Sequence, residues 1–348
     1  MRRALTLLLA AGSLAGCATV PPPDSLPAVG VAAKGETQPV GTNNADAADD
    51  PAIWRNPADP AASLIVATDK KAGLYVYGLD GQVRGFDPAG RLNNVDLIAA
   101  PDGSVLVVAS DRNDPVDARL RLYRLDTAAA KLVPLGTVGA GTGEAYGVCL
   151  WRAGPDNAEG PIEAFSVLKD GSVHQVRLDL SGSVPSGAII RSLKLATQTE
   201  GCVVDPRSAS LYVGEEDVGI WRFSARADGA TTGELVAQAD GRQLVMDTEG
   251  LAIAPEGADG GWLVASSQGD NAYAVYRLPD LAPVGRFRIA AGKFGATEET
   301  DGIDLALGDF GPDYPGGLFV AQDGNNGAAA QNFKLVSWQD VLAALAKR

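Results

Sequence analysis

The stretch DTEGLAIAP at residues 247–255 has two close counterparts in the same chain, QTEGCVVDP at 198–206 and ETDGIDLAL at 299–307. Each places a threonine, a carboxylate and a glycine before a short apolar run, and the copies lie about fifty residues apart, a spacing typical of repeat architectures. An acidic residue just before a strand is ordinarily a solvated turn residue. Three of them in register predict a repeating unit whose acidic residues meet at one place.

Two patterns recur six times along the chain. The first is a polar or acidic group followed by a strand, and it occupies residues 49–54, 93–99, 145–151, 199–205, 248–254 and 300–306. The second pattern follows each time as a strand, a polar turn and often another strand. Six β-rich units of about fifty residues predict a six-bladed β-propeller with four-stranded antiparallel blades. A β-solenoid or a sandwich assembly is the alternative, but long repeats without short-period ladders favour the propeller.

The composition supports an all-β fold and limits the possible partners. The 348 residues include 42 glycines and 21 prolines, and the apolar segments are short, mostly alternating and broken by turn residues. This pattern is typical of strands, and an amphipathic helix is expected only in the last dozen residues. The net charge of −14 argues against nucleic acid as a partner and is compatible with a site that holds cations.

The N-terminus carries an export signal. The segment MRRALTLLLAAGSLAGC has two arginines, an apolar stretch too short to span a bilayer, and small residues before Cys17. Its ending resembles a bacterial lipobox, so we expect a lipoprotein signal peptide over residues 1–17, with Cys17 lipidated and anchored to the outer membrane on its periplasmic or surface side. An ordinary signal peptide cut elsewhere is the alternative. Residues 18–34 are predicted to be a disordered tether, and residues 35–348 the propeller.

Cys149 and Cys202 remain after export, and neither lies in a motif with metal-ligand spacing. In an oxidising compartment the two residues are compatible either with a disulfide or with a pair of buried thiols. The only histidine, His174, has no evident relation to either cysteine. A catalytic cysteine is therefore not expected.

Equivalent loops of all blades of a propeller open onto one face around the central channel. To this face the first pattern contributes Asp49 or Asp50, Asn94 or Asp96, Tyr146, Glu200, Glu249 and Asp301. The second pattern contributes Lys70, Arg112, Lys169, Glu216, Gln268 and Asp323. The second set is cationic in the first three blades and not in the last three, so we expect a mouth with a basic half and an acidic half.

The two halves of this mouth suit different ligands. Carboxylates packed so densely repel one another and raise their own pKa values unless cations lie among them. Oxygen donors without histidine or cysteine suit Ca²⁺ better than zinc, and several ions are expected. The basic half suits phosphate, through charge-assisted hydrogen bonds.

Calcium beside a phosphate-binding group predicts metal-assisted phosphoester hydrolysis by direct attack of a calcium-bound water. Other phosphatase designs fit poorly. A histidine nucleophile or a histidine-ligated metal pair requires several histidines, and this chain has one. A cysteine phosphatase requires a Cys-x5-Arg loop, which neither Cys149 nor Cys202 begins.

Ten segments in consistent order give the chain a resemblance to a known family, from about residue 35 to residue 340. They are DAADDPAIW, TDKKAGLYVY, GRLNNVDL, QTEGCVVD, LYVGEEDVGIWRF, DTEGLAIA, ASSQGDNAYAVY, TDGIDLA, GGLFVAQDGNN and QNFKLVSW. Together they resemble the β-propeller phytases, six-bladed calcium-dependent enzymes that remove phosphates from myo-inositol hexakisphosphate (phytate). The resemblance implies a phosphoric monoester hydrolase of the 3-phytase type.

Residue by residue, the resemblance implies that Lys70, Arg112 and Lys169 bind substrate phosphates. It implies that the catalytic calcium ions and their bridging water are held by Tyr146, Glu200, Glu216, Asp247, Glu249, Gln268 and Asp301. Of these, Tyr146, Glu200, Glu216 and Asp301 would be catalytic. Asp49, Asp50 and the stretch from Asp323 resemble places for structural calcium. Asp170 departs from the glutamate common in the family, and we interpret Asp96, Asp304 and Asn326 as solvated turn residues.

Two other functions remain open at this point. One is a non-enzymatic propeller lipoprotein that binds calcium, phosphate or a partner protein, and it leaves the dense carboxylates unexplained. The other is a propeller lactonase with a central calcium, and it leaves Lys70, Arg112 and Lys169 unexplained. We expect a monomer that takes phytate as its small-molecule substrate, binds no nucleic acid and contacts the membrane only through the lipid anchor.

Overall fold

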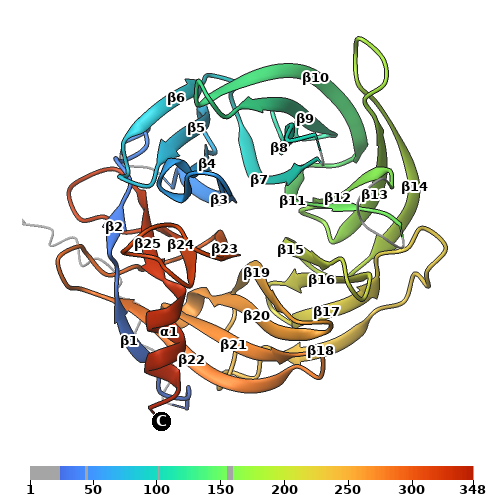
Figure 1. The fold of residues 1–348 in the computed structure, drawn as a ribbon. Helices are drawn as coiled ribbons and strands as arrows, with labels where there is room; N and C mark the ends of the chain where they lie inside the picture. The colour runs from blue at the N-terminus through green and yellow to red at the C-terminus, as the bar shows by residue number, and fades with distance from the viewer. Residues whose placement is uncertain (1–23, 44–45, 101, 155–159, 348) are drawn as a thin grey trace, which may run out of the picture.

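The computed structural model describes residues 24–43, 46–100, 102–154 and 160–347. Within these residues the strands form six small sheets arranged around a central axis (Figure 1). The predicted six-bladed β-propeller is therefore confirmed. The predicted signal peptide, with Cys17, lies outside the described residues. Within the described ranges, no helix has the length and apolar character needed to cross a membrane.

Each of the first four blades follows the chain from the axis outward, in antiparallel order. Blade 1 contains β3 (Ala48–Trp54), β4 (Leu64–Asp69), β5 (Gly73–Gly78) and β6 (Val83–Asp87). Blade 2 contains β7 (Leu92–Ala99), β8 (Val105–Asp111), β9 (Asp117–Asp126) and β10 (Lys131–Thr142). Blade 3 contains β11 (Ala145–Arg152), β12 (Ile162–Leu168), β13 (Ser172–Asp179) and β14 (Ser186–Lys194). Blade 4 contains β15 (Thr199–Asp205), β16 (Ser210–Glu215), β17 (Gly219–Ser224) and β18 (Glu234–Gln238).

The last two blades include strands from the N-terminal segment. Blade 5 contains β19 (Thr248–Glu256), β20 (Gly260–Ser267), β21 (Ala272–Leu278), β22 (Ala282–Ala290) and, outermost, β1 (Val29–Ala32). Blade 6 contains β23 (Ile303–Leu307), β24 (Gly317–Asp323), β25 (Asn332–Ser337) and, outermost, β2 (Gly35–Glu36). Two short 3₁₀ turns, η1 (Pro60–Ala62) and η2 (Gln268–Asp270), and the helix α1 (Trp338–Leu345) complete the elements.

The N-terminal segment closes the propeller at its outer edge. β2 pairs antiparallel with β25, and β1 pairs parallel with β22, from Val29 opposite Phe287 to Ala32 opposite Ala290. The tether predicted for residues 18–34 is therefore wrong over 29–32, because the short alternating run VGVA covers an otherwise unpaired strand edge of blade 5. Blade 5 accordingly has five strands instead of the four that were predicted.

The hydrophobic core lies mainly between successive blades. Val66 and Leu74 of blade 1, for example, pack with Val95 and Val107 of blade 2, and all four are nearly or fully buried. Each such side chain contributes about 1.5–3 kcal/mol through burial. This stacking fixes the blades around the axis and brings the six inner strands β3, β7, β11, β15, β19 and β23 close together at the centre (Figure 1).

Glycines allow the inner strands of neighbouring blades to approach closely. A Cβ atom on Gly147 would lie 1.9 Å from the carbonyl oxygen of Glu200, and one on Gly201 would lie 2.2 Å from that of Glu249. These distances exclude any side chain at either position. The repeated glycine after the carboxylate is therefore needed for the convergence of the strands.

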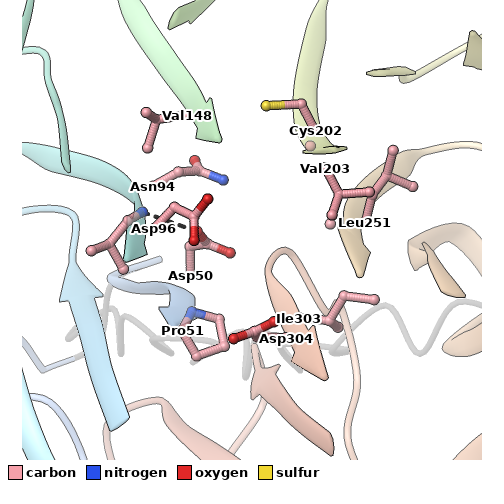
Figure 2. Close-up of a pocket in the computed structure, with 13 residues that line it drawn as sticks. Asp50, Pro51, Asn94, Asp96, Val148, Cys202, Val203, Leu251, Ile303 and Asp304 are labelled. Atoms are coloured by element: carbon pink, nitrogen blue, oxygen red, sulfur yellow. Dashed lines mark hydrogen bonds between the residues drawn. The ribbon is translucent and has the colours of Figure 1, made fainter. Parts of the chain in front are cut away.

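Carboxylates of the inner strands also join neighbouring blades through hydrogen bonds to backbone amides. Asp50 accepts a hydrogen bond from the Val95 amide at 3.0 Å, Asp96 from the Leu150 amide at 2.7 Å, and Asp304 from the Ile53 amide at 2.7 Å. The three carboxylates line a cavity of about 50 Å³ between the inner strands (Figure 2). The interpretation of Asp96 and Asp304 as solvated turn residues is therefore wrong.

Burial in the channel raises the pKa of Asp96 to about 7 and that of Asp304 to about 6, although the backbone hydrogen bonds oppose this shift. The third residue interpreted as a solvated turn, Asn326, donates a hydrogen bond to the carbonyl of Ala330 at 2.9 Å. Its loop follows β24 and lines a separate surface pocket together with Asp46 and Glu299.

We expect Asp304→Ala to destabilise the protein by about 1–3 kcal/mol, because the Ile53 amide loses its acceptor in a place where water has little access. Asp304→Asn keeps an acceptor oxygen and should retain most of the stability. The folded protein holds a proton on Asp304 up to about pH 6, whereas the unfolded chain releases it near pH 4, so this residue's contribution to stability falls as the pH rises through that window.

The stability of Asp304→Asn minus that of the wild type should therefore increase from pH 4 to pH 8. Urea unfolding of the calcium-free proteins at both pH values measures this difference, with the exposed Asp313→Ala variant as control. Equal stabilities for Asp304→Ala and Asp313→Ala would show that the blade contact contributes nothing.

Candidate active site

Six side chains at one end of the inner strands form the first layer of the site, which we call the inner ring. In blades 1 to 5 the residue is the second of the inner strand, and in blade 6 it lies two residues before β23. The inner ring consists of Asp49, Asn93, Tyr146, Glu200, Glu249 and Asp301. The six positions are equivalent in the repeat. In every blade, the residue two positions after the inner-ring residue pairs with the third-last residue of the second strand.

Asn93 is the inner-ring residue that the sequence did not identify. The candidates for blade 2 were Asn94 and Asp96, but Val95 pairs with Ala109 as Cys202 pairs with Val213, which aligns Asn93 with Glu200. Asn93 is fully buried and donates a hydrogen bond across the channel to Glu200 Oε1 at 2.6 Å. An alignment of NNV (93–95) with EGC (200–202) identifies Asn93, provided that asparagine is allowed at the glycine position.

The second layer, which we call the outer ring, is the residue directly after the second strand of each blade. It consists of Lys70, Arg112, Lys169, Glu216, Gln268 and Gly324. Five of these six were predicted. In blade 6 the predicted residue was Asp323, but this is the last residue of β24 and its place in the outer ring is taken by Gly324.

Asp323 points away from the ring because successive side chains of a strand alternate between its two sides. Its carboxylate lies 2.9 Å from the ammonium of Lys334, which is fully buried and also lies 2.7 Å from Glu36. The sequence placed Asp323 with Asp49 and Asp50 among the residues expected to hold structural calcium. Asp323 already faces a cation of the chain itself.

Three carboxylates gather in the acidic half of the site. Oxygen atoms of Glu200, Glu216 and Glu249 all lie within 4.8 Å of one another. Among the described residues, no donor reaches Glu216 Oε1, Glu249 Oε2 or the nearby Asp49 Oδ2, although all three atoms are buried. Buried carboxylate oxygens without a hydrogen bond are costly, so the cluster calls for a cation that the chain itself does not supply.

The pKa values in this half reflect burial first and mutual repulsion second. Burial, together with the charge of Asp301, raises the pKa of Glu200 to about 7. Burial also raises the pKa of Glu216 to about 7, and the charge of Asp247 adds to this. For Glu249, burial and the charge of Glu200 raise the pKa well above its usual value. At neutral pH these groups are therefore only partly ionised unless a cation is bound.

Lys70 is the cation that the chain supplies. Its Nζ lies 3.0 Å from Asp49 and 2.8 Å from both Asp301 and Asp46, and the residue is 6% exposed. Burial opposes its charge, but Asp49 and Asp301 outweigh this effect and raise its pKa. Lys70 was expected to bind phosphate, and in this structure it also joins the first and last blades of the propeller.

Tyr146 marks the boundary between the two halves. Its ring lies 5.5 Å from the guanidinium carbon of Arg112 and 5.1 Å from Nζ of Lys169, so both predicted phosphate-binding cations lie against it. On the other side Gln198 approaches its hydroxyl at 3.5 Å. Burial and the charge of Glu200 raise the pKa of Tyr146, so its hydroxyl stays protonated and can donate.

The other predicted ligands lie around the acidic half. Gln268 donates to Asp301 Oδ1 at 2.6 Å, so it belongs to the same network. Asp247 directly precedes β19, is partly exposed, and has a pKa raised by burial and by Asp217. Asp50 is the residue after Asp49 of the inner ring. Because successive side chains of a strand point to opposite sides, Asp50 lines the central cavity and does not face the three glutamates.

The donor set fits calcium. It consists of carboxylate, amide and phenol oxygens, some of them buried and without a hydrogen bond, and hard oxygen donors in such number are what Ca²⁺ prefers. The residues that would hold it are Glu200, Glu216 and Glu249, with Asp247, Asp301, Gln268 and Tyr146 beside them. Calcium bound there would neutralise charge that Lys70 alone leaves uncompensated.

We expect Lys70→Met to destabilise the calcium-free protein by about 3–5 kcal/mol, because it leaves buried carboxylates without their partner. The loss should be smaller at pH 5 than at pH 8, because burial raises the pKa of Asp49 to about 6 and the protonated form needs no partner. Thermal unfolding in the presence of a chelator measures both effects. The adjacent exposed Lys71→Met is the matched control, and equal melting temperatures for the two variants would contradict this account.

Comparison with known proteins agrees with this geometry. A family model described as phytase matches residues 3–348. The 3-phytase of Bacillus subtilis (strain 168) is 38% identical over 327 residues, which cover 89% of this chain and 84% of the relative. The match spans every blade and both rings, and the chain therefore belongs to the phytase family.

Proposed function

We propose that this protein is a calcium-dependent phytase that hydrolyses phosphate monoesters of myo-inositol hexakisphosphate. The observation that carries the proposal is the divided mouth. Buried carboxylates without hydrogen-bond donors lie on one side of Tyr146, and the cations Arg112 and Lys169 lie against its ring. Family membership adds the substrate, because the relative from Bacillus subtilis is a 3-phytase.

The basic half binds the substrate. Arg112 and Lys169 present positive charge beside a ring that limits their movement, and the ammonium and guanidinium groups form strong hydrogen bonds with phosphate oxygens. Glu144, which lies 3.6 Å from Arg112 and 3.5 Å from Arg91, balances these charges while no phosphate is bound. A lactonase would have no use for this arrangement.

The acidic half positions the attacking water and takes its proton. Glu216 is placed to accept that proton, because its Oε1 is buried and has no hydrogen-bond donor among the described residues. Asn93 and Lys70 hold Glu200 and Asp301 in place through hydrogen bonds at 2.6 and 2.8 Å. Calcium, when bound, supplies positive charge next to the phosphoryl group and restores ionisation of the carboxylates.

The two halves should respond differently to substitution and to calcium. Lys169→Ala removes charge-assisted hydrogen bonds to phosphate, so kcat/KM for phytate should fall about ten- to a hundredfold, with part of the loss in KM. Glu216→Gln keeps the shape but removes a negative charge from the metal ligands. It should lower kcat more than KM, and added calcium should restore part of the activity.

The measurement is phosphate release from phytate across a calcium titration, with Lys131→Ala and Glu234→Gln as controls on exposed strands. The wild type should be inactive in excess chelator. Calcium rescue of Lys169→Ala and not of Glu216→Gln would mean that the halves are assigned the wrong way round. Full activity of the wild type without calcium would refute the proposed cofactor.

We also propose that the protein is exported and held at the outer membrane by a lipid on Cys17. The support is the LAGC sequence after a short apolar segment, together with the Cys149–Cys202 disulfide, since disulfides persist in oxidising compartments. Replacing Cys17 by Ser should move the protein from the membrane fraction to the soluble fraction. A wild-type protein that is fully soluble after fractionation would contradict the anchor.

A further inference from the structure

The Cys149–Cys202 disulfide joins two blades at the centre of the molecule. Cys149 lies on β11 and Cys202 on β15, the inner strands of blades 3 and 4, which belong to different sheets. The bond links residues 53 positions apart in the sequence, with their Cα atoms at 5.7 Å. Both residues are buried, at 2% and 9% exposure, so the bond lies within the packed interface.

The bond replaces a hydrogen bond found at equivalent positions in other blades. Val95, Val148 and Ile303 pair with Ala109, Ser166 and Ala321, each of which lies three residues before the outer ring. The next residues along the inner strands are Asp96, Cys149 and Asp304. Asp96 and Asp304 accept hydrogen bonds from the following blade, whereas Cys149 forms a covalent bond with it. The position occupied by Asp96, Cys149 and Asp304 therefore joins blades 2, 3 and 6 to the blade that follows each of them.

The two strands that the disulfide joins carry residues of the site. Tyr146 lies three residues before Cys149, and Glu200 lies two residues before Cys202, which places them about 10 and 7 Å along their strands from the bond. Between them the strands are in contact at Gly147, where a Cβ would lie 1.9 Å from the Glu200 carbonyl. Movement of β15 away from β11 would therefore displace Glu200 relative to Tyr146, whereas Glu216 follows β16 of the same sheet as β15 and would move with Glu200.

We propose that the Cys149–Cys202 disulfide is a positioning element of the metal centre, which holds Glu200 and Glu216 of blade 4 at the distance from Tyr146 of blade 3 that a shared cation requires. The inference rests on the proposed calcium site. Residues that orient metal ligands without touching the metal commonly change affinity by about 10- to 100-fold when they are replaced. The disulfide acts in this way through the backbone of β15, without contact with substrate or ion.

The test is calcium affinity, measured by competition with a fluorescent chelator, in the double variant Cys149→Ala/Cys202→Ala. We expect the dissociation constant for calcium at the site of Glu200, Glu216 and Glu249 to be about tenfold higher in this variant than in the wild type. At low calcium kcat for phytate should fall, high calcium should restore it, and KM should change little. The control is Val341→Ala in α1, a fully buried position away from the rings, which should lower the melting temperature but leave calcium affinity unchanged.

A second variant tests the position independently of the covalent bond. Cys149→Asp/Cys202→Ala places a carboxylate where blades 2 and 6 have one, with the amide of Val204 as the donor equivalent to Leu150 and Ile53. It should recover part of the calcium affinity that the double alanine variant loses, and it provides the comparison if that variant does not fold.

Three results would overturn the inference. One is a double variant that melts earlier but has wild-type calcium affinity and kcat, which would show that the bond only adds stability. Another is an aspartate variant that folds and recovers none of the lost affinity. The last is a wild type that binds no calcium. The chelator competition measures this on the wild type alone, so that result would show that the proposed function, on which the inference rests, has failed.

Discussion

The site depends on keeping several carboxylates together in a place where water has little access. Asp49, Glu200, Glu249 and Asp301 all lie in the inner ring, and burial raises the pKa of each. Such a cluster is stable only if positive charge lies among its members or if protons neutralise them. Lys70 provides one charge and contacts Asp46, Asp49 and Asp301 together, and the remaining deficit of positive charge is what the proposed calcium would supply.

The architecture supplies the crowding that creates this deficit. A propeller brings the same position of every repeat to one ring, and the glycine after the ring residue removes the side chain that would keep the strands apart. Gly147, Gly201, Gly250 and Gly302 each face backbone or side-chain atoms of the next blade at distances that no Cβ tolerates. The same contact that closes the fold therefore also sets the distances between ligands, which couples the stability of the propeller to the chemistry of its mouth.

The repeat made most of this predictable from the sequence. The blades, five of the six outer-ring residues and five of the inner-ring residues follow from the two patterns that recur six times along the chain. Asn93 was missed because Asn94 stands where blades 3 to 6 have glycine, which obscured the register. Asp323 was assigned to the ring because a carboxylate was expected there, and only the strand's alternation shows that Gly324 takes its place.

Contacts between distant segments were beyond the sequence. Nothing local distinguishes Asp96 and Asp304 from solvated turn residues, because their partners Leu150 and Ile53 lie in other blades. The pairing of β1 with β22 and the bond between Cys149 and Cys202 likewise depend on how the propeller closes. These contacts are fixed by packing between repeats, which the pattern within one repeat does not contain.

The most direct measurement of the central claim is the location of calcium in crystals grown with calcium, by anomalous diffraction. This account predicts strong anomalous peaks within coordination distance of Glu200, Glu216 and Glu249, whose oxygens already lie within 4.8 Å of one another. It also predicts that these peaks are absent from crystals of Glu249→Gln soaked at the same calcium concentration. Calcium found only outside the two rings, with the three glutamates bound to protein donors instead, would contradict it.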